Sequence, residues 1–315
     1  MLILSETQIA RLLADPGGLV DALDGAFRRG DADSMSGMKV QVASVDGGFF
    51  QALPAVLKSQ QLAAVKWVGV NSGTTGSPRI QASIILSDAL TSEPLALVAG
   101  TALTAIRTAA MSALAAKYLM SRDAETIGFL GCGAQAKAHW LVFKAVFPRL
   151  ESALCYSLTS AETFARTLRH SGCDAAATSD ARSVISHSDV VISSVPQGGA
   201  VDGAPVFHAG WIKPGAYVSM VDLGRAWIPG TQRPNARTFT DYIPQSKRLV
   251  EMDKLRFVDT FEADLYGLAS GQAPSIGREP RIFVFGGMGM CDAVVADYVY
   301  RRAIDGGIGT HVDMR

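Results

Sequence analysis

The stretch from Thr126 to Trp140 limits the fold more than any other part of the chain. It reads TIGFLGCGAQAKAHW: an apolar run of β-strand character, a glycine-rich turn and the start of an apolar helical pattern. A strand, a glycine turn and a helix in this order make up the βα unit of dinucleotide-binding domains. A glycine turn in an α/β domain without a nucleotide is the alternative, and the strand and helix on either side favour cofactor binding.

Each small residue of this turn has a physical role in that interpretation. Gly131 permits the tight turn, Gly133 lets the backbone approach a pyrophosphate, and Ala136 lets the helix pack closely on the strand. The first N–H groups of the helix and its dipole are directed at the phosphates. We therefore assign the turn to the cofactor, including Ala134 and Gln135.

Alternating strands and helices follow this unit. Strands are expected over 152–156, 174–177, 189–194, 216–221 and 237–242, and helices over 160–170 and 181–186. Buried strands that alternate with helices form a parallel sheet, whose cofactor crevice lies at the carboxyl ends of the strands. Together with Thr108 from the preceding helix, the residues assigned to the cofactor there are Ser194, Val195, Pro196 and Val221.

The end of the second strand decides which nicotinamide cofactor fits. An acidic side chain there would hold the ribose hydroxyls and repel a 2′-phosphate. The chain reads CYSLTS over 155–160, without Asp or Glu, and the hydroxyls of Ser157 and Thr159 could donate to a phosphate. The sequence therefore favours NADP(H) over NAD(H), although no Arg is present in this segment.

The N-terminal third has a different pattern. Helices are expected over 6–13 and 19–29, separated by a break at 16–18. Strand patterns follow over 37–45, 48–53, 62–71, 80–86 and 94–98, with Pro54 closing the second. This predicts an α+β unit that is mostly antiparallel. A strand from 281 into a glycine turn, and a helix over 292–304 with an apolar core stripe, come near the end of the chain.

Two cationic residues stand in apolar surroundings. Lys66 lies within LAAVKWVGVN at 62–71, where a lysine is usually at an exposed edge or extends its stem to water. Arg107 lies near the start of an Ala-rich helix expected over 101–120. A guanidinium keeps its charge when buried and needs an anion. A substrate carboxylate or a structural ion pair would satisfy Arg107.

The composition excludes several functional classes. Lys and Arg number 29, as do Asp and Glu, and no basic block is present, which argues against a nucleic-acid partner. The N-terminal apolar runs are broken by Glu6 and Arg11 well short of a membrane span, and nothing reads as a targeting segment. The 4 cysteines have no metal-ligand spacing, so we expect no metal and a reduced, cytoplasmic protein.

With these stretches on view, the chain resembles the ornithine cyclodeaminase/μ-crystallin family, which also contains alanine dehydrogenases and cyclic ketimine reductases. The matching segments keep the family's order along nearly the whole chain: LPAV at 53–56, AAVKWVGVN at 63–71, LTAIRTAAMSALAAKYL at 103–119, IGFLGCGAQA at 127–136 and GMGMCDAVVADYVYRRAIDGGIGT at 287–310.

The resemblance implies a homodimer of two-domain α/β chains. A substrate-binding and dimerisation domain would span 1–120, a Rossmann-type dinucleotide-binding domain 121–290, and a C-terminal helix over 291–315 would return to the first domain. The resemblance also implies that Arg107 binds an amino-acid carboxylate. Lys66 would hold the carboxylate or transfer a proton near the imine, with a pKa lowered by its apolar strand. Lys39 would be a third anion contact.

Two departures limit what the resemblance implies about activity. Several family members have an Arg two residues before the tripeptide that matches LPA at 53–55, and this chain has Gln51 at that position. The cyclodeaminases place an Asp in a pattern like INAVGxDxPGK; Asp222, taken here as a third catalytic residue, stands about two positions early and PGK is missing. This departure lowers the expectation of ornithine cyclodeamination.

The sequence therefore predicts an NAD(P)H-dependent oxidoreductase acting on the C–N bond of a small α-imino or α-amino acid. Reduction of a cyclic ketimine such as Δ1-pyrroline-2-carboxylate, or of an α-keto acid with an amine, suits a carboxylate site with one lysine of adjustable pKa. One alternative is ornithine cyclodeaminase, an NAD-dependent ammonia lyase. The other is a μ-crystallin-like protein that binds NADP(H) and a small ligand without turnover.

Overall fold

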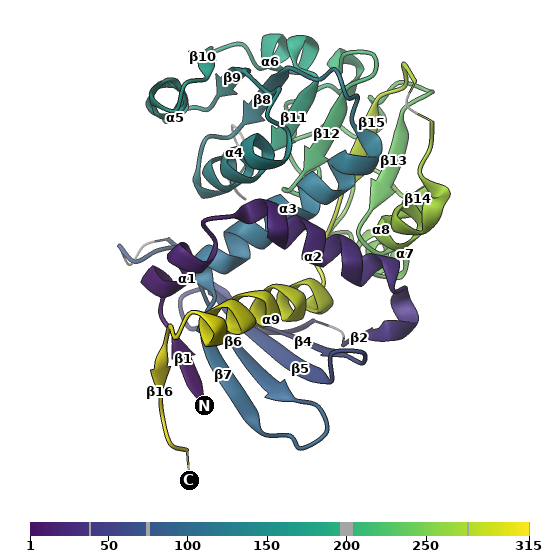
Figure 1. Cartoon of the computed structure of the whole chain (residues 1–315). Helices are drawn as coiled ribbons and strands as arrows, with labels where there is room; N and C mark the ends of the chain where they lie inside the picture. The colour runs from purple at the N-terminus through teal and green to yellow at the C-terminus, as the bar shows by residue number, and fades with distance from the viewer. Residues whose placement is uncertain (38, 74–75, 196–203, 276, 315) are drawn as a thin grey trace. The chain divides into compact units, whose positions relative to one another are not determined.

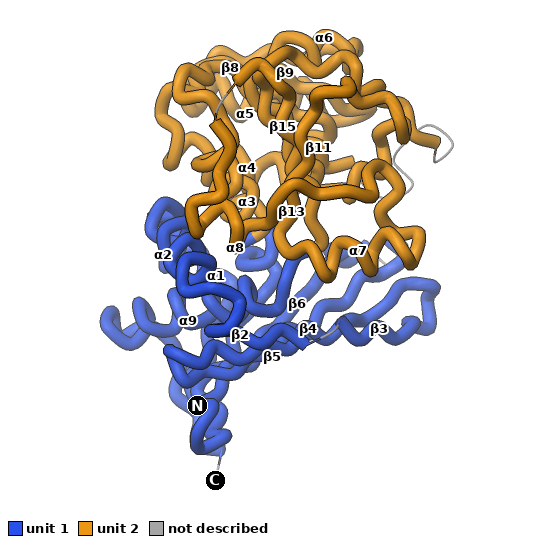
Figure 2. Tube along the Cα trace, turned by 90° about the vertical axis from the view of Figure 1, so that its right-hand side faces the viewer, with its two compact units in different colours: residues 1–107, 287–315 blue, residues 108–286 orange. Residues whose placement is uncertain are grey.

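The computed structural model describes residues 1–37, 39–73, 76–195, 204–275 and 277–314. The chain forms two compact units, shown in Figure 2: unit 1 contains residues 1–107 and 287–315, and unit 2 contains residues 108–286. The boundaries fall within helix α3 (Thr101–Leu119) and just before helix α9 (Gly289–Asp305). The sequence had placed them at 120/121 and 290/291.

Unit 1 is built on one 8-stranded sheet in the order β16-β1-β7-β6-β5-β4-β2, with β3 paired to β4. Its strands are β1 (Leu2–Leu4), β2 (Ser34–Ser36), β3 (Val40–Ala43), β4 (Phe49–Leu57), β5 (Leu62–Val70), β6 (Ile80–Asp88), β7 (Pro94–Ala99) and β16 (Thr310–His311). All neighbours are antiparallel except β1 and β7, which are parallel. The predicted antiparallel character therefore describes most of this sheet.

One face of this sheet is covered by α9, which packs across β4, β5 and β6 (Figure 1). Helices α1 (Glu6–Leu12) and α2 (Pro16–Arg28) pack against α9 in turn. Because side chains alternate along a strand, every second residue of β5 is buried under α9: Leu62, Ala64, Lys66 and Val68. This alternation turns the side chain of Lys66 inward.

Two local predictions for unit 1 were wrong. The two expected helices are separate, but the break lies before Pro16 and not at 16–18: Pro16 opens α2, because its fixed φ suits the first turn and the Asp15 carboxylate accepts from the N–H of Gly17. Pro54 was expected to end its strand, yet β4 pairs with β5 continuously from Phe49 to Leu57. The carbonyl of Pro54 also accepts from the N–H of Gly37.

Unit 2 contains an 8-stranded parallel sheet in the order β10-β9-β8-β11-β12-β15-β13-β14. Its strands are β8 (Thr126–Leu130), β9 (Ser152–Tyr156), β10 (Asp174–Ala177), β11 (Val190–Ser193), β12 (Tyr217–Met220), β13 (Arg237–Thr240), β14 (Ala263–Asp264) and β15 (Arg281–Val284). The order reverses between β8 and β11, which is where doubly wound sheets bind dinucleotides. The predicted Rossmann-type fold is confirmed.

Three helices accompany this sheet as the alternating pattern predicts: α4 (Ala134–Val146), α5 (Ala161–His170) and α6 (Ala181–His187). Two more were not expected from the sequence, α7 (Ile243–Glu251) and α8 (Leu265–Gly267). Helix α5 packs on β9 and β10, and α6 on β8 and β9. The inner strands are apolar and fully buried, as in Val190–Ser193. Among the described helices, none combines the length and apolar character needed to cross a bilayer.

Candidate active site

Three charged side chains meet in the interior of unit 1. The Nζ of Lys66 lies 2.8 Å from Oδ1 of Asp292, and the Nε of Arg107 lies 3.0 Å from the same oxygen. The three side chains are 1%, 9% and 2% exposed for Lys66, Arg107 and Asp292. Two cations and one carboxylate leave this cluster with an excess positive charge, which suits an anionic ligand.

Each member comes from a different element. Lys66 points inward from β5, Asp292 lies in the first turn of α9, and Arg107 belongs to α3. The turn before α9 makes room for the guanidinium, because a Cβ on Gly287 would lie 2.8 Å from the Nη1 of Arg107. Gly287 also has φ +76, a conformation that favours glycine.

The pKa of Lys66 is lowered to about 8, mainly because burial penalises the charged amine. The neighbouring positive charge of Arg107 lowers the pKa further, and the charge of Lys39 adds to this effect. Asp292 raises the pKa of Lys66 in opposition to these effects, through its negative charge and its hydrogen bond. Lys66 is therefore a lysine that can gain or lose a proton near neutral pH, as its apolar strand had led us to expect.

Sequence reasoning did not identify Asp292. The helix that carries it was interpreted from its apolar stripe as core, and an acidic residue in a first helical turn is common because it complements the helix dipole. The one available signal for Asp292 was that it lies within 287–310, a segment that carries the family resemblance. Lys66 and Asp292 are 226 positions apart, so no local spacing relates them.

The predicted third cation and the departure at Gln51 lie near this cluster in the strand register. Lys39 immediately precedes β3 and is half-buried. Gln51 lies opposite Val68, two pairs along β4 and β5 from the pair of Leu53 with Lys66. The Nε2 of Gln51 donates to Oε1 of Gln41 at 3.0 Å.

The glycine turn of unit 2 has the geometry that a dinucleotide requires. Gly131 has φ +89, and a Cβ there would lie 2.9 Å from the carbonyl oxygen of Ser194. Gly133 precedes α4 as its N-cap, and nothing lies within 4 Å of where its Cβ would be. Ala136 is fully buried beneath this turn. The exposed backbone around Gly133 and Ala134 at a helix N-terminus therefore fits a pyrophosphate.

Asp222 lies at the carboxyl end of β12, and its carboxylate is bound inside unit 2. Oδ2 accepts from the Oγ of Ser193 at 2.7 Å and from the N–H of Val195 at 3.4 Å. Oδ1 accepts from the N–H of Gly224 at 3.0 Å, and the indole N–H of Trp227 donates to Ser193 Oγ. Burial raises the pKa of Asp222 to about 6. Two of these bonds connect Asp222 to the end of β11 and to Val195, and a catalytic role for Asp222 stays a prediction.

The remaining predicted cofactor residues are distributed over unit 2. Ser157 Oγ lies 2.9 Å from Ser160 Oγ after β9, and Thr159 between them is exposed. Ser194 Oγ donates to the carbonyl of Gly131 at 3.3 Å. Thr108 and Gln135 belong to α3 and α4, Val221 follows β12, and Pro196 lies outside the described residues. Within the described part of the chain, no group of three or more His, Cys, Asp or Glu side chains could hold a metal ion.

Comparison with known proteins gives consistent matches. The family model described as ornithine cyclodeaminase/mu-crystallin family matches residues 1–307. The ketimine reductase mu-crystallin of Macropus fuliginosus is 27% identical over 316 residues, which cover 94% of this chain and 96% of that protein. The chain is thus similar to this family along almost its entire length.

Two solved structures show the same fold. The Δ1-pyrroline-2-carboxylate reductase of Thermococcus litoralis, in complex with NADH and L-proline, superposes with a TM-score of 0.87 at 26% identity, covering 99% of this chain and 100% of that one. An archaeal alanine dehydrogenase dimer with bound NAD gives a TM-score of 0.85 at 26% identity, covering 100% of this chain and 99% of that one.

Proposed function

Because the chain belongs to the ornithine cyclodeaminase/mu-crystallin family, we propose that it is an NAD(P)H-dependent oxidoreductase acting on the C–N bond of a small α-imino or α-amino acid. The observation that carries this proposal is the buried cluster of Lys66, Arg107 and Asp292. A buried cluster with excess positive charge is costly without an anion, and a substrate carboxylate supplies one.

In this proposal, Arg107 binds the substrate carboxylate and fixes its orientation. Lys66 handles the proton near the substrate nitrogen: with a pKa of about 8 it is mostly protonated at neutral pH and still able to release its proton. A bound nicotinamide dinucleotide supplies the hydride. Gly131, Gly133 and the first N–H groups of α4 hold its pyrophosphate.

The proposed substrate is a cyclic ketimine such as Δ1-pyrroline-2-carboxylate, or an α-keto acid with an amine. The names of the relatives support this choice, since they include ketimine reductases and Δ1-pyrroline-2-carboxylate reductases. The carboxylate of such a substrate matches Arg107, and its imine nitrogen matches a lysine that carries a proton at neutral pH.

We further propose NADP(H) as the preferred form of the cofactor. No carboxylate stands between Ser157 and Ser160 to hold the ribose and repel a 2′-phosphate. The nearest one, Glu162, forms an ion pair with Arg169 at 2.5 Å within α5. The related structures contain NAD or NADH, so the ratio of kcat/KM for NADPH and NADH tests this choice directly.

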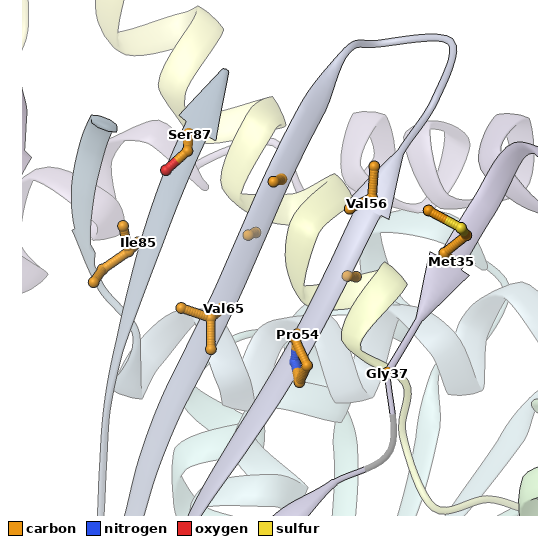
Figure 3. A pocket seen from close by; sticks show the side chains of 10 residues that line it. Met35, Gly37, Pro54, Val56, Val65, Ile85 and Ser87 are labelled. Atoms are coloured by element: carbon orange, nitrogen blue, oxygen red, sulfur yellow. The ribbon is translucent and has the colours of Figure 1, made fainter. Parts of the chain in front are cut away.

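A homodimer and a cytoplasmic location belong to the same proposal. The face of the unit 1 sheet opposite α9 carries exposed apolar side chains, including Trp67, Ile85 and Met35. A shallow hollow on this face is lined mostly by apolar residues, among them Pro54, Val56 and Val65 (Figure 3). A second copy would bury this surface, as large exposed apolar faces usually require. The four cysteines are free thiols, in keeping with a reducing compartment.

The deciding experiment follows absorbance at the reduced-nicotinamide band with NADPH or NADH. The substrates are a panel of cyclic ketimines and of keto acids with amines. Oxidation with one of them supports the reductase and identifies the cofactor. No oxidation of the cofactor with any of the substrates, while NADPH still binds, would refute the reductase proposal. Release of ammonia from ornithine would then favour cyclodeamination. No release of ammonia would favour a μ-crystallin-like binding protein.

A further inference from the structure

The two oxygens of the Asp292 carboxylate have different surroundings. Its Oδ1 contacts both cations, Lys66 Nζ at 2.8 Å and Arg107 Nε at 3.0 Å. Its Oδ2 is buried, and among the described residues no protein group donates a hydrogen bond to it. One oxygen thus carries two ionic contacts, while the other accepts no hydrogen bond from the described residues.

A buried carboxylate oxygen without a donor is unfavourable. Leaving such an acceptor unsatisfied costs about 1–3 kcal/mol, and more when the group is charged. The side chain of Asp292 is only 2% exposed, so bulk water does not compensate. The oxygen therefore suits a ligand that brings its own N–H or O–H donor, above all a positively charged one.

An α-imino or α-amino acid carries such a donor next to its carboxylate. With the carboxylate on Arg107, the nitrogen is only two bonds from the carboxylate carbon, and Arg107 and Asp292 are already in contact. We infer that Oδ2 of Asp292 accepts the N–H of the substrate nitrogen. This inference rests on the proposed function and adds to it the group that recognises nitrogen.

The assignment explains how one site can select C=N over C=O. A protonated imine or amine donates to Oδ2, whereas a keto or ether oxygen in the same place has only lone pairs and is repelled by the carboxylate. A site that relies on a hydrogen bond rejects the analogue that lacks it, because its own polar group is then left unpaired. Arg107 alone cannot make this distinction, since both kinds of ligand carry the carboxylate.

The test compares two ligands that differ only at this atom: L-proline and its oxygen isostere (S)-tetrahydrofuran-2-carboxylate. Binding is measured by calorimetry with the cofactor-free protein and again with saturating NAD⁺ or NADP⁺. The wild type should bind L-proline roughly 30-fold more tightly, which is the size of one charge-assisted hydrogen bond. In Asp292→Asn the preference should vanish or reverse, because the amide can donate to the ring oxygen.

Asp297→Asn is the matched control. Asp297 lies on the same helix, and its Oδ1 accepts from the Nε of Arg301 at 2.7 Å. The control should keep the wild-type preference for L-proline. Circular dichroism verifies that both variants are folded.

The outcomes separate this inference from the proposed function. Equal binding of both ligands by the wild type would refute the role of Asp292 and leave the carboxylate site standing; this comparison needs no variant. A preference that survives in folded Asp292→Asn would refute it as well. Binding of neither ligand by the wild type would overturn the proposed function and this inference with it.

Discussion

Replacing Gly131 by alanine should destabilise the protein through two separable effects. Its φ of +89 is unfavourable for a residue with a side chain, at about 1–2 kcal/mol. The new Cβ would also lie 2.9 Å from the carbonyl oxygen of Ser194, a backbone atom that cannot move alone. Such overpacking costs about 1–3 kcal/mol. We therefore expect a loss of about 2–5 kcal/mol.

Two matched glycines isolate these effects. Gly172 has φ +83 and open space around it, so Gly172→Ala should show the conformational cost alone, about 1–2 kcal/mol. Gly133 has a negative φ and open space, so Gly133→Ala should change stability by less than about 1 kcal/mol. Its methyl group nevertheless stands where a pyrophosphate would approach, and NADPH affinity should fall at least roughly tenfold.

Urea denaturation followed by circular dichroism measures the stabilities, and NADPH fluorescence titration measures the affinities. Gly133→Ala should be the most stable of the three variants, Gly172→Ala should be intermediate, and Gly131→Ala should be the least stable. Equal stability of the Gly131 and Gly172 variants would show that the contact with Ser194 is relieved at no cost. Unchanged NADPH affinity in Gly133→Ala would remove this turn from the cofactor site.

The remaining predictions concern the charged groups. Arg107→Ala should raise KM for carboxylate substrates by roughly 100-fold, since it removes about 3 kcal/mol of charged hydrogen bonding; unchanged kinetics would contradict the carboxylate contact. Activity of the wild type in reduction should fall as pH rises through about 8, where Lys66 loses its proton. Lys66→Met should lose most of kcat and the fall of activity above about pH 8, while still binding NADPH. Turnover at the wild-type rate would exclude a role for Lys66 in the reaction. The raised pKa of Asp222 means that the folded state binds more protons between pH 4 and 6, so unfolding free energy should fall across that range by about 3 kcal/mol. Asp222→Asn should remove that slope, and a persisting slope in urea titrations would assign it to other groups.

The parts of the fold that follow from local pattern were predicted well. The βα unit at 126–146 is specified by neighbouring residues: an apolar strand, glycines that turn, and a helix with small residues beneath it. Its parallel sheet follows because buried strands alternate with helices along the chain. Helix α7 was missed, since its segment has few buried residues and a proline at its start.

The cluster of Lys66, Arg107 and Asp292 depends on information that local sequence pattern does not contain. The apolar run around Lys66 is compatible with an edge strand or a central one, and only the pairing of β5 with both β4 and β6 decides between them. Arg107 was left between a substrate anion and a structural ion pair, and the structure contains the ion pair with Asp292. That pair does not exclude a substrate carboxylate, because a guanidinium has five N–H donors.

The discontinuity of unit 1 has a consequence for synthesis on the ribosome. Lys66 is synthesised 226 residues before Asp292. At a translation rate of about 5–20 residues per second, the Asp292 carboxylate therefore follows roughly 10 to 45 s later. Residues 108–286 form a continuous segment that can fold during this interval, whereas the sheet of unit 1 still lacks α9. In a nascent chain halted at residue 286, Lys66 can be buried only as the neutral amine or as an unpaired charge. Synthesis of the segment 287–315 is therefore the step that completes the cluster of Lys66, Arg107 and Asp292.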